Sequence, residues 1–257
     1  MRILLTNDDG FYANGLQALA TALRARGDTV WIVAPSANRS GTSCALTLDR
    51  PIAVTPYSEQ SFIVDGTPAD CIHIALTGLA SVADFDIVLS GMNDGANLGD
   101  DAIHSGTIGA AIQANLYGLP ALACSLVERG WTYLDTAVQC TLSVLDDLYQ
   151  LSYTNIDTNT DTNANINTNN CLLWNLNIPN QPNLPVVTPA FIGRRMPSKP
   201  VLPILSPKGS SLYWIGQGGD VLPKIGNDMA VVAAGQAALT PITLDRTDYA
   251  ALQTFAR

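Results

Sequence analysis

Ile3-Leu4-Leu5-Thr6-Asn7-Asp8-Asp9-Gly10 decides the fold, because a short apolar run there ends abruptly in a polar cluster. The segment that follows has helical periodicity, with Asn14 as its expected N-cap and Gly27 as its expected end. Its apolar residues recur at helical spacing: Leu16, Leu19, Ala20 and Leu23. Thr29–Ala34 is a second β-rich run. A strand, a helix and a strand at this spacing form a βαβ unit, so we expect a parallel sheet.

The alternation of strands and helices continues to about residue 180, which predicts an α/β fold with a mainly parallel sheet. The further strands are expected at Ile52–Thr55 and Phe62–Val64, as a hairpin, and at Asp86–Ser90, Ala121–Leu126 and Leu172–Ile178. Helices are expected after Thr67-Pro68, from Ser105 to Tyr117 with Gly118 as the stop, and from Thr132 to Leu151.

The composition changes sharply near residue 154. Residues 154–170 are almost wholly Thr, Asn and Asp, which predicts a flexible insertion, because such a segment buries too little apolar surface to offset its ordering entropy. Beyond Pro179 the chain is rich in Pro and Gly, with β-like pieces around Ser211–Ile215 and Ala237–Thr243. We therefore expect a catalytic core over residues 1–180 and an irregular β-containing C-terminal arm over residues 181–257 that serves oligomerisation.

Acidic residues outnumber basic residues, 22 against 13, for a formal net charge of −9. That balance argues against polymeric nucleic acid as a partner, because such binding requires clustered Lys and Arg. The five cysteines show no C-x-x-C pairing, which favours a reducing compartment. No signal peptide is recognisable and no apolar run has spanning length, so we expect a cytoplasmic protein without a membrane partner.

Three of the expected strands end in loops rich in polar residues: 7–10, 35–43 and 90–107. Ligands bind outside the carboxyl ends of the strands in an open parallel sheet, so these loops are expected to meet at one edge. Asp8 and Asp9 repel each other unless a hard divalent cation, which prefers oxygen ligands, lies between them. The alternative is that one carboxylate caps the following helix and the other is solvated.

The loop over residues 90–107 carries glycines at 91, 95, 99 and 106, and Ser105-Gly106-Thr107 opens a helix whose free N–H groups can bind phosphate. An ordinary glycine-rich turn with Ser105 as a cap is the other interpretation. Arg39 can clamp a phosphate oxygen or lie on the surface, and Ser40 can bind a metal or cap a turn. For His104, a proton donor to the leaving oxygen and a site-lining side chain both remain open.

Several enzyme classes lack their signatures here. No G-x-x-x-x-G-K-[ST] motif occurs and no lysine precedes Lys199, which excludes a P-loop. No G-x-G-x-x-G motif opens a helix after a strand, no G-x-S-x-G elbow is present, and two histidines leave little for a Ser-His-Asp triad. A phosphatase of the haloacid-dehalogenase type, with an aspartyl-phosphate intermediate, would require an Asp-x-Asp pair, whereas Asp8 and Asp9 are contiguous.

Several longer motifs resemble the SurE family of survival-protein nucleotidases. They are Ile3 to Gly10, Val33-Ala34-Pro35 with Asn38-Arg39-Ser40-Gly41, Gly66-Thr67-Pro68-Ala69-Asp70-Cys71, Ser90-Gly91-Met92-Asn93-Asp94-Gly95-Ala96-Asn97-Leu98-Gly99 and Ser105-Gly106-Thr107. Weaker similarity continues in Tyr213-Trp214-Ile215-Gly216 and Leu239-Thr240-Pro241. The resemblance spans most of the chain and is densest over residues 1–126.

The resemblance implies a Rossmann-like three-layer core and an arm exchanged in a homodimer or homotetramer. It also implies a divalent-metal phosphomonoesterase that releases phosphate from nucleoside 5′- and 3′-monophosphates, and in some members from short polyphosphate. The metal ligands would be Asp8, Asp9, Ser40 and Asn93. Departures from the family pattern are His104 where Tyr is common, the bulky Phe11-Tyr12, the insertion, and Gly235–Ala238 in the arm.

The resulting hypothesis is a 5′-nucleotidase with Asp8 and Asp9 as catalytic residues and one Mg²⁺ or Mn²⁺ per subunit. The phosphate or substrate contacts are expected from Asn38, Arg39, Asn97, His104, Ser105, Gly106 and Thr107. In this hypothesis a water activated at the metal attacks phosphorus in line. A nucleotide- and metal-binding module without hydrolysis is the alternative from a different functional class.

Overall fold

A computed structural model describes residues 1–154, 172–216, 218–222, 224–245 and 247–255. The insertion expected at residues 154–170 lies outside these ranges, apart from Thr154. Among the described residues, nine strands form one sheet. They are β1 (Arg2–Thr6), β2 (Thr29–Pro35), β3 (Val54–Ser58), β4 (Ser61–Val64), β5 (Ile87–Asp94), β6 (Ala121–Leu126), β7 (Leu173–Ile178), β8 (Val187–Pro189) and β13 (Ala237–Pro241).

The sheet has the order β3-β4-β2-β1-β5-β6-β7-β13-β8. Its centre, from β4 to β7, is parallel throughout, which confirms the predicted parallel sheet. β3 pairs antiparallel with β4 as the expected hairpin. β13 pairs antiparallel with β7, and β8 pairs parallel with β13. The sheet therefore includes strands beyond residue 180, where we expected the core to end.

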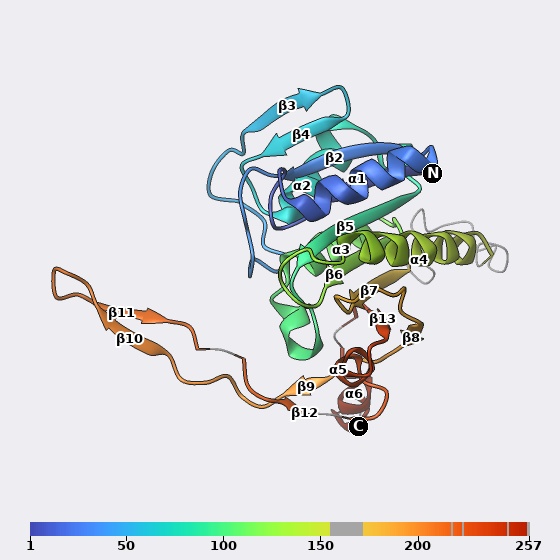
Figure 1. Ribbon diagram of the computed structural model, residues 1–257. Coiled ribbons are helices and arrows are strands. Elements are labelled where there is room, and N and C mark those ends of the chain that lie inside the picture. Colours follow the sequence, from blue (N-terminus) through green and yellow to red (C-terminus); the bar gives the residue numbers. More distant parts are fainter. Residues whose placement is uncertain (155–171, 217, 223, 246, 256–257) are drawn as a thin grey trace.

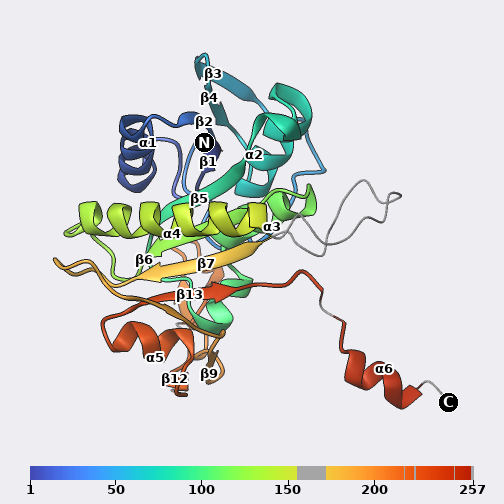
Figure 2. The same cartoon turned by 90° about the vertical axis from the view of Figure 1, so that its right-hand side faces the viewer.

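Helices cover both faces of the sheet and complete the three layers of an α/β fold (Figures 1 and 2). The helices are α1 (Asn14–Arg26), α2 (Pro68–Ile74), α3 (Gly106–Leu116), α4 (Leu134–Thr154), α5 (Asp228–Ala233) and α6 (Tyr249–Phe255), with shorter turns at Ala75–Leu79, Val82–Asp84 and Gly99–Ile103. Ile3 and Leu5 pack with α1 and α4, whereas Leu4 packs with α2 and α3. The alternation along β1 therefore assigns each residue to one of two apolar cores.

Local signals explain most helix ends. Gly27 adopts the left-handed conformation and ends α1 as predicted, because a residue without Cβ meets no strain there. Thr67 and Asp70 form a capping box at the start of α2. The N-cap of α1 is Ala13, however, so the prediction of Asn14 was wrong; Asn14 is already the first helical residue.

β5 is longer than predicted and runs to Asp94. Its pairing with β6 shifts register between Ser90 and Asn93, then resumes with Asn93 opposite Ser125. Such an irregularity near a strand end redirects side chains without ending the strand. Asn93 is therefore carried on a strand rather than on the loop that we expected.

Much of the C-terminal segment extends away from the sheet (Figure 1). It contains the pairs β9 (Arg194–Arg195) with β12 (Val221–Leu222) and β10 (Leu202–Leu205) with β11 (Ser211–Trp214). All residues of β10 and β11 are exposed. Among the described residues, no helix has both the length and the apolar composition needed to cross a membrane.

Candidate metal and phosphate site

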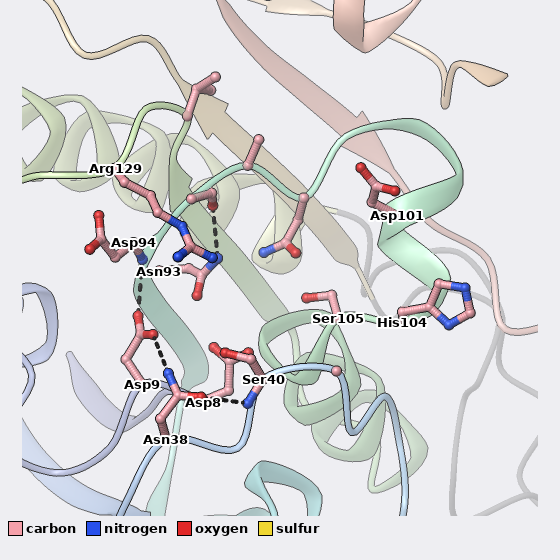
Figure 3. A pocket seen from close by; sticks show the side chains of 15 residues that line it. Asp8, Asp9, Asn38, Ser40, Asn93, Asp94, Asp101, His104, Ser105 and Arg129 are labelled. Carbon is pink, nitrogen blue, oxygen red and sulfur yellow. Dashed lines mark hydrogen bonds between the residues drawn. The ribbon is translucent and has the colours of Figure 1, made fainter. Parts of the chain in front are cut away.

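A cleft of about 420 Å³ lies at the carboxyl ends of β1, β2, β5 and β6 (Figure 3). Its lining combines acidic, amide and hydroxyl side chains with two basic ones. The residues are Asp8, Asp9, Asn38, Ser40, Gly41, Asn93, Asp94, Gly95, Ala96, Asn97, Asp101, His104, Ser105, Val127 and Arg129. The three predicted loops thus meet at one edge, as the topology of a parallel sheet requires.

Asp8 is held at the start of α3. The hydroxyl of Thr107 donates to its Oδ1 at 2.7 Å, and Gly106 lies so close that a Cβ there would be 2.9 Å from the Cβ of Asp8. Burial raises the pKa of Asp8 to about 6; the Thr107 hydrogen bond opposes this effect and the charge of Asp9 adds to it. The ionised pair is therefore costly until a cation compensates it.

Asp9 accepts two hydrogen bonds from the cleft walls. Asn38 Nδ2 donates to its Oδ1 at 3.1 Å, and the backbone N–H of Asp94 donates to its Oδ2 at 2.9 Å (Figure 3). Burial raises the pKa of Asp9, while the hydrogen bond from Asp94 and the charge of Arg129 act in the opposite direction. The carboxylate is thus positioned by the loop after β2 and by the end of β5 together.

The other expected ligands surround the acidic pair. Asn38 Oδ1 accepts the Ser40 N–H at 3.0 Å and so shapes the loop that carries the Ser40 hydroxyl. Asn93 Nδ2 donates to the Gly95 carbonyl at 2.7 Å, an arrangement that commits the amide nitrogen and leaves Oδ1 as the ligating atom. Asn97 is buried, and its Nδ2 donates to Ser125 Oγ at 2.8 Å.

This donor set fits a hard divalent cation. Two carboxylates, one amide oxygen and one hydroxyl are all oxygen ligands, the kind that Mg²⁺ and Mn²⁺ prefer. Among the described residues no group of three His, Cys, Asp or Glu side chains is disposed to hold a metal. The described cleft lining contains one histidine and no cysteine, so the site matches an oxygen-ligated cation better than a zinc centre of His and Cys.

Three of the expected substrate contacts lie outside the cleft lining. Arg39 forms an ion pair with Asp65, with Nη2 at 2.8 Å from Oδ1, so its side chain is engaged away from the cleft. Gly106 and Thr107 are buried behind Asp8. The start of α3 thus supports the Asp8 carboxylate, and only Ser105 of the expected phosphate loop lines the cleft.

His104 lies at the rim, between this cleft and a second cavity of about 410 Å³. Its side chain is exposed, and it shares the lining of both spaces with Asp101. The second cavity also holds Arg194 and Arg195, which form ion pairs with Asp100 and Asp101 at 3.0 and 2.9 Å. His104 thus lies where the cleft opens into the second cavity.

Sequence reasoning missed three charged residues of the cleft: Asp94, Asp101 and Arg129. Arg129 lies in the loop that follows Ala121–Leu126, itself a predicted strand. The strand-end rule that selected three loops would have selected this fourth loop as well. This loop has no Asn or Asp and a single glycine, Gly130, and this difference from the other loops explains the omission.

The family model described as "Survival protein SurE" matches residues 3–196. The chain belongs to the SurE family. A protein called "5'-nucleotidase SurE" from Variovorax paradoxus is 42% identical over 98% of this chain and 95% of its own length. One of the same name from Laribacter hongkongensis is 39% identical over 97% and 95%. A crystal structure of a SurE protein from Aquifex aeolicus superposes with a TM-score of 0.79 at 28% identity, covering 99% of this chain and 98% of that one.

Proposed function

We propose that this SurE-family chain is a 5′-nucleotidase, a divalent-metal-dependent phosphomonoesterase that hydrolyses nucleoside 5′- and 3′-monophosphates. The observation that carries the proposal is the meeting of Asp8, Asp9, Ser40 and Asn93 in one cleft that also exposes polar groups for a phosphate. The names of two relatives at about 40% identity, which match nearly the whole chain, support the same activity.

In the proposed mechanism, Asp8, Asp9, Ser40 and Asn93 hold one Mg²⁺ or Mn²⁺, which when bound supplies Lewis acidity toward the phosphoryl oxygens. The carboxylates of Asp8 and Asp9 orient the attacking water in line with the leaving oxygen. Asn38 and Ser105 donate to the phosphoryl oxygens from the cleft walls. Asn97 supports the wall behind them, because its Nδ2 donates to Ser125 and Thr107. Thr107 and Gly106 keep Asp8 in place from behind.

The residues of the cleft argue against one alternative and leave the other to a measurement of turnover. A haloacid-dehalogenase-type reaction uses a lysine beside the nucleophilic Asp, and none of the residues described as lining the cleft is a lysine. A binding module without hydrolysis would use the same residues. Turnover, rather than binding, therefore has to be measured.

The test is phosphate release from AMP by the purified full chain with Mn²⁺, with and without EDTA. Chelation should abolish turnover, and Asp9→Asn should lower it at least about a hundredfold, because the negative charge of a metal ligand is lost. Asp147→Asn, an exposed position on α4, removes the same charge far from the cleft and should leave turnover unchanged. Full activity of Asp9→Asn, or binding of AMP without phosphate release, would refute the proposal.

We further propose that residues 181–257 contribute the arm of a homodimer or homotetramer in the cytoplasm, and that short polyphosphate is an additional substrate. The exposed apolar hairpin β10–β11 supports the first point, because a two-stranded hairpin alone is marginally stable in water. The open rim at His104 and the adjoining second cavity give a longer phosphate chain room to extend.

A further inference from the structure

Arg129 reaches into the cleft from the loop that follows β6. Figure 3 shows its guanidinium group turned inward toward Asn93, rather than away from the cleft. Among the described residues, no hydrogen bond or ion pair to another side chain engages this guanidinium. Its charge nevertheless lowers the pKa of Asp9, against the larger effect of burial. The group is therefore close to the acidic pair and still has its donors available.

The loop around Arg129 is anchored on both sides. Asp94 Oδ1 accepts the Gly130 N–H at 2.9 Å, which ties the loop to the end of β5. Trp131 packs on the first turn of α1, where a Cβ at Gly15 would lie 2.6 Å from the ring. The Arg129 side chain itself crosses Gly95, whose Cβ, if present, would lie 3.7 Å from the Arg129 Nε. The backbone is thus fixed while the guanidinium remains free to bind.

The charge of the cleft explains why such a group is needed. Asp8, Asp9, Asp94 and Asp101 all line it, and Arg129 is the one permanently cationic side chain in the described lining. A phosphomonoester arrives with a charge of about −2 near neutral pH, since its second pKa is about 6. Arg195 pairs with Asp101, and one divalent cation offsets two of the three remaining carboxylates. A second positive charge therefore strengthens the binding of a dianion markedly.

We propose that Arg129 is a substrate-binding residue whose guanidinium pairs with two non-bridging oxygens of the phosphoryl group, in the ester and in the phosphate product. The inference rests on the proposed phosphatase function. A planar fork of N–H donors matches two oxygens of one phosphate, which is the arrangement that a guanidinium offers and an ammonium does not. A phosphomonoester end group presents such oxygens as a dianion, so Arg129 favours it over a phosphodiester, which carries one charge less.

The experiment measures binding of inorganic phosphate to the Mn²⁺-loaded full chain by calorimetry. Arg129→Met keeps the length of the side chain and removes its charge and donors, so Kd for phosphate should rise about ten- to a hundredfold. Arg129→Lys should recover part of the loss. Kd for Mn²⁺ should stay equal or fall in Arg129→Met, because a repelling charge near Asp9 is gone.

Arg24→Met is the matched control. Arg24 lies in the last turn of α1, near the start of β2, whereas the cleft lies at the carboxyl ends of the strands. Neither Kd should change in it. Phosphate binding within twofold of the unsubstituted chain in Arg129→Met would overturn the inference. A parallel loss of phosphate and Mn²⁺ binding would also overturn it, because that pattern reports a distorted loop.

The substrate assay separates the two proposals. If AMP is hydrolysed, Arg129→Met should raise KM for AMP about tenfold or more. If AMP is not hydrolysed but phosphate binding depends on Arg129, the nucleotidase proposal fails and the binding role of Arg129 stands. Absence of phosphate binding to the unsubstituted Mn²⁺-loaded chain would refute the role of Arg129 directly.

Discussion

At the scale of single residues, burial of Asp8 opposes its ionisation, and this conflict sets the pH behaviour of the cation-free protein. The side chain is nearly inaccessible, and its pKa rises from 3.8 to about 6, chiefly through burial. Because the folded chain binds this proton more tightly than the unfolded chain, the stabilising contribution is complete below about pH 4. It is lost as the pH rises through about 6.

Asp8→Asn should therefore stabilise the cation-free protein at pH 7.5, by about 1–3 kcal/mol in the free energy of unfolding. The Asn side chain has no charge to desolvate and still offers an oxygen to the Thr107 hydroxyl. Urea unfolding in EDTA measures the effect, which should shrink toward zero below pH 4. In the same series, Asp147→Asn should show no comparable pH dependence, because that side chain is exposed.

The opposite order of stability would contradict this account of Asp8. If Asp8→Asn unfolds more easily than the unsubstituted chain in EDTA at pH 7.5, the folded protein stabilises the ionised Asp8 carboxylate instead of disfavouring it. Added Mn²⁺ should reverse the ranking, because only the unsubstituted chain retains both carboxylates for the cation.

At the scale of elements, the contact between α3 and the loop after β2 brings two halves of the site together. Gly109 faces the loop so closely that a Cβ there would lie 2.0 Å from the Ser43 carbonyl oxygen. Ser43 is also tied to the segment before α3, since its N–H donates to the His104 carbonyl at 3.1 Å and its hydroxyl donates to the Ile103 carbonyl at 2.8 Å. Because Ser43 lies in the same loop as Ser40, these contacts between the loop and α3 also fix the position of Ser40.

Gly109→Ala should lower the free energy of unfolding by about 1–3 kcal/mol, because backbone atoms of the loop must move to admit a methyl group. The same movement should weaken Mn²⁺ binding several-fold by displacing Ser40. Thermal unfolding and Mn²⁺ titration measure the two effects. Gly78→Ala is the control: it lies in a helical turn with nothing within 4 Å of the added Cβ. If Gly109→Ala changes neither the free energy of unfolding nor Mn²⁺ binding, the contact between α3 and the loop after β2 is looser than the structure indicates.

At the scale of the whole molecule, the β10–β11 hairpin exposes apolar side chains on both faces, and one face carries a continuous set of four. The antiparallel register places Leu202 opposite Trp214 and Ile204 opposite Leu212, so all four side chains lie on the same side. Each of them is exposed, Trp214 by 66%. An apolar face of this kind on a projecting hairpin is typical of a surface that another chain covers.

The double substitution Ile204→Asp with Trp214→Asp should dissociate the proposed homo-oligomer, with a rise in its Kd on the order of a hundredfold. Sedimentation velocity at matched concentrations measures the change, and circular dichroism should show an intact core. Ser211→Asp adds a charge to the opposite face of the same hairpin and should leave assembly unaffected. A monomeric unsubstituted chain, or an assembly indifferent to the double substitution, would refute the proposed role of the arm.

Local sequence, within about ten residues, determined the order of helices and strands in this protein and several of their ends. The βαβ alternation, the stop at Gly27, the capping box at Thr67 and the placement of Asp8 at a strand end all follow from local periodicity and turn chemistry. Such features are encoded in short windows because the hydrogen bonds that produce them join near neighbours in the chain.

Contacts between distant segments could be read only from the tertiary structure. Arg39 turns to Asp65, β13 inserts beside β7, and Arg129 reaches the acidic pair across more than a hundred residues of sequence. Each outcome depends on which partners the whole fold brings within a few ångströms. The free energy of such a contact depends on the packing around it, and no short stretch of sequence specifies that packing.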